Sequence, residues 1–299
     1  MKILIITGGN SSERKISLIS AKEVQKALLR KGYEVEIYDL KKGYEPLKRL
    51  SKQFDVIFPV LHGEEGEGGI LHEFLSKLDK PIVGSKNYKG FKEAWYKISF
   101  KKYCDKNGVL SSAWKVINTP KDVTRFGFPC VVKTSNGGSS REVFILKSGK
   151  DLVKDQKKIF EYKNLFVERY IEGVEATVGI FSNKALPILE IVAPKGKWFD
   201  YKNKYSGATK EILNAPSLNE KTKKEIQKMA LKIHQDFNLG SYSRIDFMVD
   251  KQNRPYVLEV NTIPGLTSES LLPKEVKAIG ITFDRFIDLL VKLSLDKKP

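Results

Sequence analysis

Residues 240–271 read GSYSRIDFMVDKQNRPYVLEVNTIPGLTSESL, a stretch in which two β-forming runs flank a turn. Residues 243–249 and 255–260 are rich in β-branched and aromatic side chains. The DKQN segment at 250–253 between them is a turn signal. The stretch therefore predicts a β-hairpin followed by a loop that begins near residue 261.

One face of this hairpin gathers charged and amide side chains. With the turn centred between Gln252 and Asn253, Asp246 lies opposite Glu259 and Arg244 opposite Asn261, and cross-strand Cβ atoms are roughly 4.5–5.5 Å apart. Two carboxylates held that close repel unless one is protonated or a cation lies between them. Oxygen ligands of this kind suit Mg²⁺, so Asp246, Glu259 and Asn261 are predicted metal ligands. A solvated strand face is the alternative.

The loop after the hairpin leaves the strand through Pro264 and Gly265, so its backbone is shaped for close approach to another group. The combination of R-x-D with E-x-N-T-x-P-G-x-T resembles the C-terminal signature of D-alanine–D-alanine ligases, which belong to the ATP-grasp superfamily. The resemblance covers essentially the whole chain. It implies an α/β ATP-grasp fold of three α/β subdomains, with a small N-terminal parallel sheet and two ATP-binding lobes.

Length and composition are those of a soluble globular protein. At 299 residues the chain exceeds one ordinary core, and no apolar run approaches the ~20 residues of a membrane span. The net charge of +17 could indicate nucleic-acid binding, but no aromatic RNA-binding cluster or Cys/His finger accompanies it. A solvated surface that steers anionic nucleotides is favoured. Cys104 and Cys130 offer no disulfide framework, which suits a reducing cytoplasm.

Three segments are expected from the order of strands and helices: an N-terminal substrate-binding domain at 1–84, a central lobe at 85–175 and a C-terminal lobe with the metal and catalytic residues at 176–299. Alternation of strands and helices predicts a parallel sheet in the first segment, with ligands at the carboxyl ends of its strands. Strands are expected at 2–7, 34–38, 56–59, 81–83, 113–117, 130–133, 176–181 and 187–193, and helices at 17–31, 69–78, 219–237 and 283–293.

Two loops fall at the carboxyl ends of the first segment's strands, at 8–14 and 61–68. Their patterns GGxSxERxxSL and LHGxxGE match the N-terminal pattern of the resembling family. The resemblance implies that Glu13 binds the ammonium of the first D-alanine, and that His62 and Glu67 lie near that substrate and hold Glu13 in place. Gly68 stands where the family usually has Asp.

A lysine leaves the strand at 130–133 into the loop TSNGGSS, which is the composition of a phosphate cradle, although a flexible hairpin turn has the same composition. In the resemblance Lys133 and Lys97 contact ATP phosphates, and Ser139 and Ser140 belong to the loop. This chain departs from the family's pattern at Trp95, Tyr96, Arg141 and Glu142.

Residues 165–175 resemble the linker between the two ATP-holding lobes. The backbone at Arg169 and Ile171, with the Glu168 carboxylate, suits adenine, and Glu175 suits the ribose hydroxyls. The loop at 198–207 resembles a lid over the site, with Lys204 near the phosphates. Its Tyr205 would close the first substrate pocket through Ser139 and Glu13, and speaks against depsipeptide-forming relatives, which carry His there.

The resemblance implies ligation of two D-alanines to D-alanyl-D-alanine through an acyl phosphate, for peptidoglycan precursors, with ATP and two Mg²⁺ (or Mn²⁺) ions. Arg244 and the Gly265 N–H would form the oxyanion site, and Ser270 with the Leu271 amide would bind the second carboxylate. A ligase for D-lactate or D-serine is one alternative, and a basic scaffold that binds nucleic acid is another. The sequence leaves open whether the chain forms a homodimer.

Overall fold

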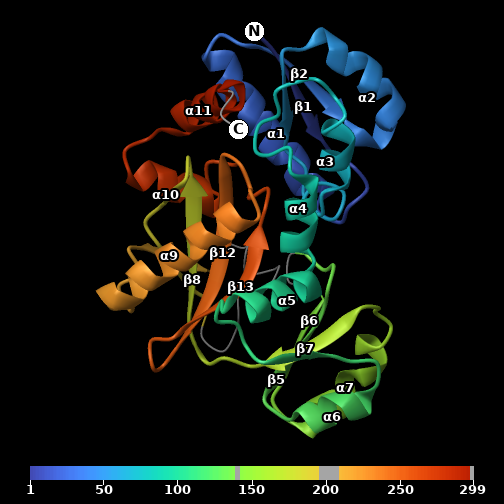
Figure 1. Cartoon of the computed structure of the whole chain (residues 1–299), viewed down its shortest axis with the longest axis vertical. Helices are drawn as coiled ribbons and strands as arrows, with labels where there is room; N and C mark the ends of the chain where they lie inside the picture. Colours follow the sequence, from blue (N-terminus) through green and yellow to red (C-terminus); the bar gives the residue numbers. More distant parts are fainter. Residues whose placement is uncertain (139–141, 195–208, 297–299) are drawn as a thin grey trace.

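The computed structural model describes residues 1–138, 142–194 and 209–296, and Figure 1 shows that these form three stacked units. The N-terminal unit lies at one end, and the unit drawn in green lies at the other. The large sheet of the C-terminal part lies between them. Ser139, Ser140, Arg141, Lys204 and Tyr205 fall outside the described residues.

The N-terminal unit is built on a parallel sheet of order β2-β1-β3, which confirms the expected small parallel sheet. The strand expected at 81–83 is wrong, because the chain makes only one bridge there, between Ile57 and Ile82, before Gly84 turns it away with a φ of +97°. The elements are β1 (Lys2–Thr7), α1 (Arg14–Arg30), β2 (Glu34–Asp39), α2 (Tyr44–Leu50), β3 (Val56–Pro59) and α3 (Ile70–Leu75), with 3-10 turns at Leu40–Lys42 and Ser51–Gln53.

The last helix of the chain, α11 (Phe283–Leu295), returns to this N-terminal unit and lies beside α1 (Figure 1). Its Phe286 and Leu290 are fully buried in one apolar core with Ile3 of β1 and Val24 of α1. At the rim of this core, Arg30 donates through Nε and Nη2 to the two carboxylate oxygens of Asp284, each at 2.6 Å. The first and last segments of the sequence therefore share one core.

The central sheet in Figure 1 is antiparallel, with strands in the order β11-β10-β8-β12-β13 and β9 paired to β8. Helix α9 packs its buried side chains onto this sheet, because its apolar residues recur on one face. The elements are β8 (Gly173–Phe181), β9 (Lys184–Ala185), β10 (Leu189–Val192), β11 (Lys210–Leu213), α9 (Glu220–Asp236), β12 (Tyr242–Asp250), β13 (Pro255–Asn261) and α10 (Leu271–Ala278).

The predicted hairpin pairing is confirmed, with Asp246 opposite Glu259 and Arg244 opposite Asn261. Nearer the turn, however, Phe247 pairs with Val257, so the turn is centred half a residue earlier than expected. A β-bulge at Leu258 adds one residue to β13 and restores the predicted pairs. Without the bulge, Glu259 would point to the other face of the sheet.

The third sheet has the order β4-β7-β5-β6, and all its pairings are antiparallel. The N-termini of α6 and α7 each carry a capping box, from Thr119 with Asp122 and from Ser148 with Asp151, which fixes where these helices begin. The elements of this unit are β4 (Trp114–Val116), α6 (Pro120–Phe126), β5 (Cys130–Thr134), β6 (Val143–Leu146), α7 (Gly149–Ile159) and β7 (Leu165–Arg169). The two helices that precede them, α4 (Tyr88–Trp95) and α5 (Lys97–Asn107), pack into the core of the central sheet.

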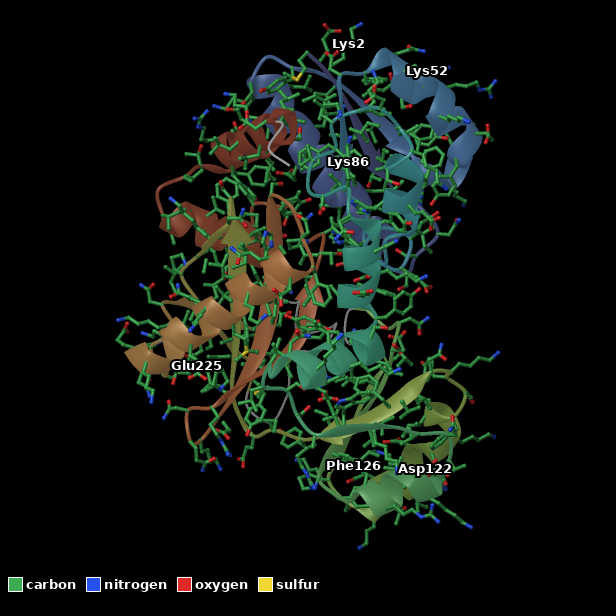
Figure 2. The ribbon with its side chains drawn as sticks, in the orientation of Figure 1. Lys2, Lys52, Lys86, Asp122, Phe126 and Glu225 are labelled. Atoms are coloured by element: carbon green, nitrogen blue, oxygen red, sulfur yellow. The ribbon has the colours of Figure 1, made fainter. Side chains whose placement is uncertain are left out.

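The excess of lysine is spread over the molecule. Figure 2 shows Lys2 and Lys52 at the outer end of the N-terminal unit and Lys86 closer to the middle. Exposed pairs such as Lys2 with Glu34 accompany them. Within the described residues, none of the helices combines the length and the apolar character needed to cross a bilayer.

Candidate active site

Two adjoining cavities share a wall formed by Lys97, Gly137, Gly138 and Glu259. The first cavity lies between the central and third sheets and is lined by residues of β5, β6, β7, β12 and β13. The second lies between the N-terminal loops and the loop that follows β13. A group in one cavity can therefore reach a group in the other at this wall.

The hairpin brings the predicted metal ligands together on one face. Asp246 accepts from Arg244 Nε and Nη2 at 2.9 and 2.8 Å, from Asn261 Nδ2 at 2.9 Å and from Thr177 Oγ1 at 2.5 Å. Burial alone would lower the pKa of Arg244, but the Asp246 carboxylate outweighs it and the pKa is raised. Arg244 lines the second cavity and Asp246 the first.

This donor set fits Mg²⁺. Asp246, Glu259 and Asn261 offer only oxygen ligands, since Asn261 donates through its nitrogen and keeps its amide oxygen. No group of three or more His, Cys, Asp or Glu side chains gathers as a metal site in the described part of the chain. A metal held here would therefore complete its coordination with water and with oxygens of a bound nucleotide.

Lys97, the first residue of α5, lies in the shared wall and lines both cavities. Its Nζ donates to the Gly137 carbonyl at 2.7 Å and lies 3.2 Å from Glu259 Oε2. Its backbone N–H donates to Ser135 O at 2.8 Å, which anchors the start of the Gly/Ser loop on α5. Lys97 thus places an ammonium beside both the predicted phosphate loop and a predicted metal ligand.

Lys133 belongs to a buried ionic cluster in the first cavity. Glu168 accepts from Lys133 Nζ at 2.5 Å, from Lys101 Nζ at 2.7 Å and from Ser112 Oγ at 2.6 Å. Burial alone would raise the pKa of Glu168, but the two lysines outweigh it and lower it. Burial likewise opposes the charge of Lys133, yet Glu168 raises its pKa. The cluster thus holds two ammoniums on one carboxylate, and of the two lysines Lys133 lines the cavity.

The predicted adenine linker lines the first cavity at Arg169, Ile171 and Glu175. The Arg169 backbone N–H already donates to Ala113 O at 2.8 Å. Since Glu168 also has three partners of its own, a contact from its carboxylate to a base would come in addition to these. The adenine and ribose assignments stay predictions.

The N-terminal side of the second cavity holds Glu13, His62 and Glu67 together. Burial, with a smaller contribution from Arg244, lowers the pKa of His62 although Glu13 opposes this. Burial and the Glu13 charge raise the pKa of Glu67 to about 8. The Gly63 N–H donates to Glu67 Oε2 at 3.0 Å. At neutral pH His62 and Glu67, the two neighbours of Glu13, are therefore largely uncharged.

The C-terminal side of the second cavity is the loop from Gly265 to the start of α10. Ser270 Oγ accepts from the Thr267 N–H at 3.2 Å, and a Cβ at residue 265 would lie 2.8 Å from this oxygen. Ser270 is the N-cap of α10, and Leu271 is its first residue. Both line the cavity, so the positive end of the α10 dipole faces it.

Comparison with known proteins gives a consistent result. A family model described as D-ala D-ala ligase C-terminus matches residues 105–292, more than half of the chain. The D-alanine–D-alanine ligase of Clostridium beijerinckii is 35% identical over 99% of both chains. That of Aquifex aeolicus is 37% identical over 97% of this chain and all of its own.

The chain belongs to the D-alanine–D-alanine ligase family.

Solved structures agree with the family assignment. The Bacillus anthracis D-alanine–D-alanine ligase complexed with ATP has a TM-score of 0.85 and 31% identity, covering 99% of this chain and 97% of that chain. A second structure of the same enzyme has a TM-score of 0.86 and 33% identity, with the same coverage. The predicted α/β ATP-grasp fold is confirmed.

Of the departures from the family's pattern, Gly68, Trp95, Tyr96 and Glu142 lie within the described residues. At Gly68, where an Asp is usual, a Cβ would lie 2.4 Å from the backbone oxygen of Glu64, so the loop is built around glycine. Trp95 lines the second cavity, and Tyr96 donates to Glu64 at 2.5 Å. Glu142 lines the first cavity beside Gly137.

Four site residues were missed by the sequence reasoning: Lys101, Ser112, Thr177 and Glu275. Lys101 had a signal, because it lies four residues after Lys97 and so on the same side of a helix. Thr177 reaches the site because it pairs with Asp246 in the sheet, Ser112 does so through its hydrogen bond to Glu168, and Glu275 does so from α10. No local pattern marks these three.

Proposed function

We propose that this chain joins two D-alanine molecules into D-alanyl-D-alanine with hydrolysis of ATP to ADP and phosphate. The observation that supports this most is the shared wall of Lys97, Gly138 and Glu259 between a lysine-lined cavity and a cavity suited to amino acids. The matched relatives are named D-alanine–D-alanine ligases, and one solved neighbour is complexed with ATP.

ATP occupies the first cavity in this proposal. Lys97 and Lys133 bear on the phosphates, the loop through Gly138 surrounds them, and the apolar side chains of Ile145 and Met248 face the base. Asp246, Glu259 and Asn261 would hold the metal. The family resemblance implies that two Mg²⁺ (or Mn²⁺) ions bind there. Such a metal neutralises phosphate charge and orients the γ-phosphoryl group.

The first D-alanine binds in the second cavity with its ammonium on Glu13. Because His62 and Glu67 are mostly uncharged at neutral pH, Glu13 is the anion that the ammonium finds there. The substrate carboxylate then faces the shared wall and accepts the γ-phosphoryl group as ADP leaves. The product of this step is an acyl phosphate, which is a far better electrophile than a carboxylate.

The second D-alanine is oriented by the start of α10. Its carboxylate lies at Ser270 and the Leu271 N–H, where the helix dipole favours an anion. Its neutral amine attacks the acyl phosphate carbonyl, and the amide forms as phosphate departs. Arg244 and the Gly265 N–H stabilise the developing oxyanion, a contribution of roughly 3–4 kcal/mol for each donor.

We further propose the cytoplasm as the compartment, with the dipeptide used for peptidoglycan precursors. Cys104 and Cys130 are both buried and unpaired, as expected for a chain kept in reducing conditions. D-Lactate and D-serine are not favoured as second substrates, since the relatives matched over full length carry the D-alanine name.

The first test measures release of ADP with D-alanine, with L-alanine and without an amino acid. The second separates the products formed when D-lactate and D-serine compete with D-alanine as second substrate. We expect D-alanine-dependent ADP release and D-alanyl-D-alanine as the main product. Glu13→Gln is the matched variant, and it should raise the KM for the first D-alanine. ADP release that ignores D-alanine, or a depsipeptide as the main product, would overturn the proposal.

A further inference from the structure

Glu275 of α10 is a fully buried acidic residue that the proposed reaction does not use. Its Oε1 accepts from the backbone N–H of Gly179 in β8 at 2.9 Å. Its Oε2 has no hydrogen-bond partner among the residues that the structure describes. A buried polar atom without a partner costs about 1–3 kcal/mol, so its retention calls for a reason.

The space for this carboxyl group is provided by Gly179. A Cβ at that position would lie 2.3 Å from Leu272 Cδ1 and 2.5 Å from Glu275 Oε2. Any side chain at residue 179 would therefore compete with the carboxyl group. The absence of a side chain at Gly179 leaves the space that the carboxyl group of Glu275 occupies.

That place is on the same face of the sheet as Arg244. Gly179 pairs directly with Arg244 in the β8–β12 register, and residues directly opposite each other share a face. Burial raises the pKa of Glu275 well above its usual range, and the nearby charge of Arg244 opposes this shift, so an approaching guanidinium favours the ionised carboxylate. The unpartnered Oε2 thus lies within electrostatic reach of the guanidinium.

Arg244 has a conflict of roles at this point. Its guanidinium makes two hydrogen bonds to Asp246, and these occupy the carboxylate that the proposed function assigns to a metal. A cation bound to Asp246 would compete for the same oxygens and would repel the guanidinium. For the metal to bind well, Arg244 needs a second acceptor that keeps its charge neutralised.

We propose that Glu275 is a positioning residue whose unpartnered Oε2 receives Arg244 when Asp246 takes up a metal ion. This inference rests on the proposed function. The exchange frees Asp246 for the metal and keeps Arg244 in the second cavity, where the oxyanion forms. Glu275 itself touches neither substrate nor metal.

The experiment measures binding of Mn²⁺ in the presence of ADP by electron paramagnetic resonance, so that no turnover is needed. We expect Glu275→Gln to weaken Mn²⁺ binding about tenfold or more, the scale of one lost charge-assisted hydrogen bond. Glu190→Gln is the matched control. Glu190 of β10 is also a buried carboxyl group, but both its oxygens accept from Ser217, and this variant should bind Mn²⁺ like the wild type.

A double-variant cycle separates partner exchange from general electrostatics. In an Arg244→Met background no guanidinium competes for Asp246, so Glu275→Gln should leave Mn²⁺ binding unchanged. If Glu275→Gln weakens binding equally in both backgrounds, its charge acts directly on the metal and the proposal is wrong. Wild-type affinity in the Glu275→Gln single variant overturns it as well.

Glu275→Met guards against loss of fold, because an apolar side chain of similar length often replaces a buried charge without loss of stability. It should show the same weakened Mn²⁺ binding as the amide, and unchanged binding would again overturn the inference. Failure of the proposed function has a different signature. In that case the wild type would neither bind Mn²⁺ with ADP nor release ADP in response to D-alanine.

Discussion

Replacing Glu67 with glutamine should make the protein more stable at neutral pH than the wild type. Glu67 is buried beside Glu13 and keeps its proton up to a pKa of about 8, whereas an unshifted carboxyl group has a pKa of 4.5. Glutamine has no proton to lose. It still offers an oxygen to the Gly63 N–H, which donates to Glu67 at 3.0 Å in the wild type.

The sign and size of the effect follow from proton binding. Between pH 4.5 and about 8 the folded wild type holds a proton that the unfolded chain has lost, so its stability falls as the pH rises. Each pH unit in this window is worth about 1.4 kcal/mol. The free energy of unfolding of Glu67→Gln, relative to wild type, should therefore rise by about 3 kcal/mol from pH 4.5 to pH 7.

The measurement is urea unfolding of both proteins at several pH values from 5 to 8, without nucleotide and with a metal chelator. Glu13→Gln is an informative companion, because removing the Glu13 charge should lower the pKa of Glu67 and weaken the pH dependence. Parallel stability curves for the wild type and Glu67→Gln across this range would refute the reasoning, whatever their constant offset.

Three further substitutions test separate parts of the structure. Gly179→Ala should reduce the free energy of unfolding by about 1–3 kcal/mol, since its Cβ would collide with Leu272 and Glu275; wild-type stability in urea would contradict this. Glu168→Gln should cost about 3–5 kcal/mol and raise the KM for ATP, because two buried ammoniums lose their carboxylate; an unchanged Tm would count against it. Arg244→Lys keeps the charge but not the two-nitrogen contact, and should lower kcat by about 10²–10³ with little change in the KM for ATP. In steady-state kinetics, loss of ATP binding alone would assign this arginine to the nucleotide instead.

The hairpin shows how far the sequence could predict the site. Alternation along the strands correctly placed Asp246 opposite Glu259, because both ends of the hairpin carry strong β and turn signals. The bulge at Leu258 could not be foreseen, since nothing in the residues near it departs from an ordinary strand. The sequence prediction placed the turn half a residue too late along the chain. The bulge at Leu258 cancelled this error, so the predicted pairs were correct.

Other features depend on contacts between distant segments, which local patterns do not report. The ion pair of Lys101 with Glu168 joins α5 to β7, and Glu275 contacts Gly179, which is 96 residues away in the sequence. The strand expected at 81–83 failed for a related reason, because its apolar residues meet the sheet at one bridge only. The segment limits at residues 84 and 175 stay predictions.

The return of α11 to the N-terminal unit has a consequence for synthesis on the ribosome. The apolar side of α1 packs against Phe286 and Leu290, which leave the ribosome long after α1 does. Until they emerge, the first 80 or so residues carry an uncovered hydrophobic surface, although their strands can already pair. A nascent chain therefore completes the core of its N-terminal unit only after α11 has emerged, and loss of α11 by truncation or proteolysis should expose the N-terminal unit to aggregation before the rest of the molecule.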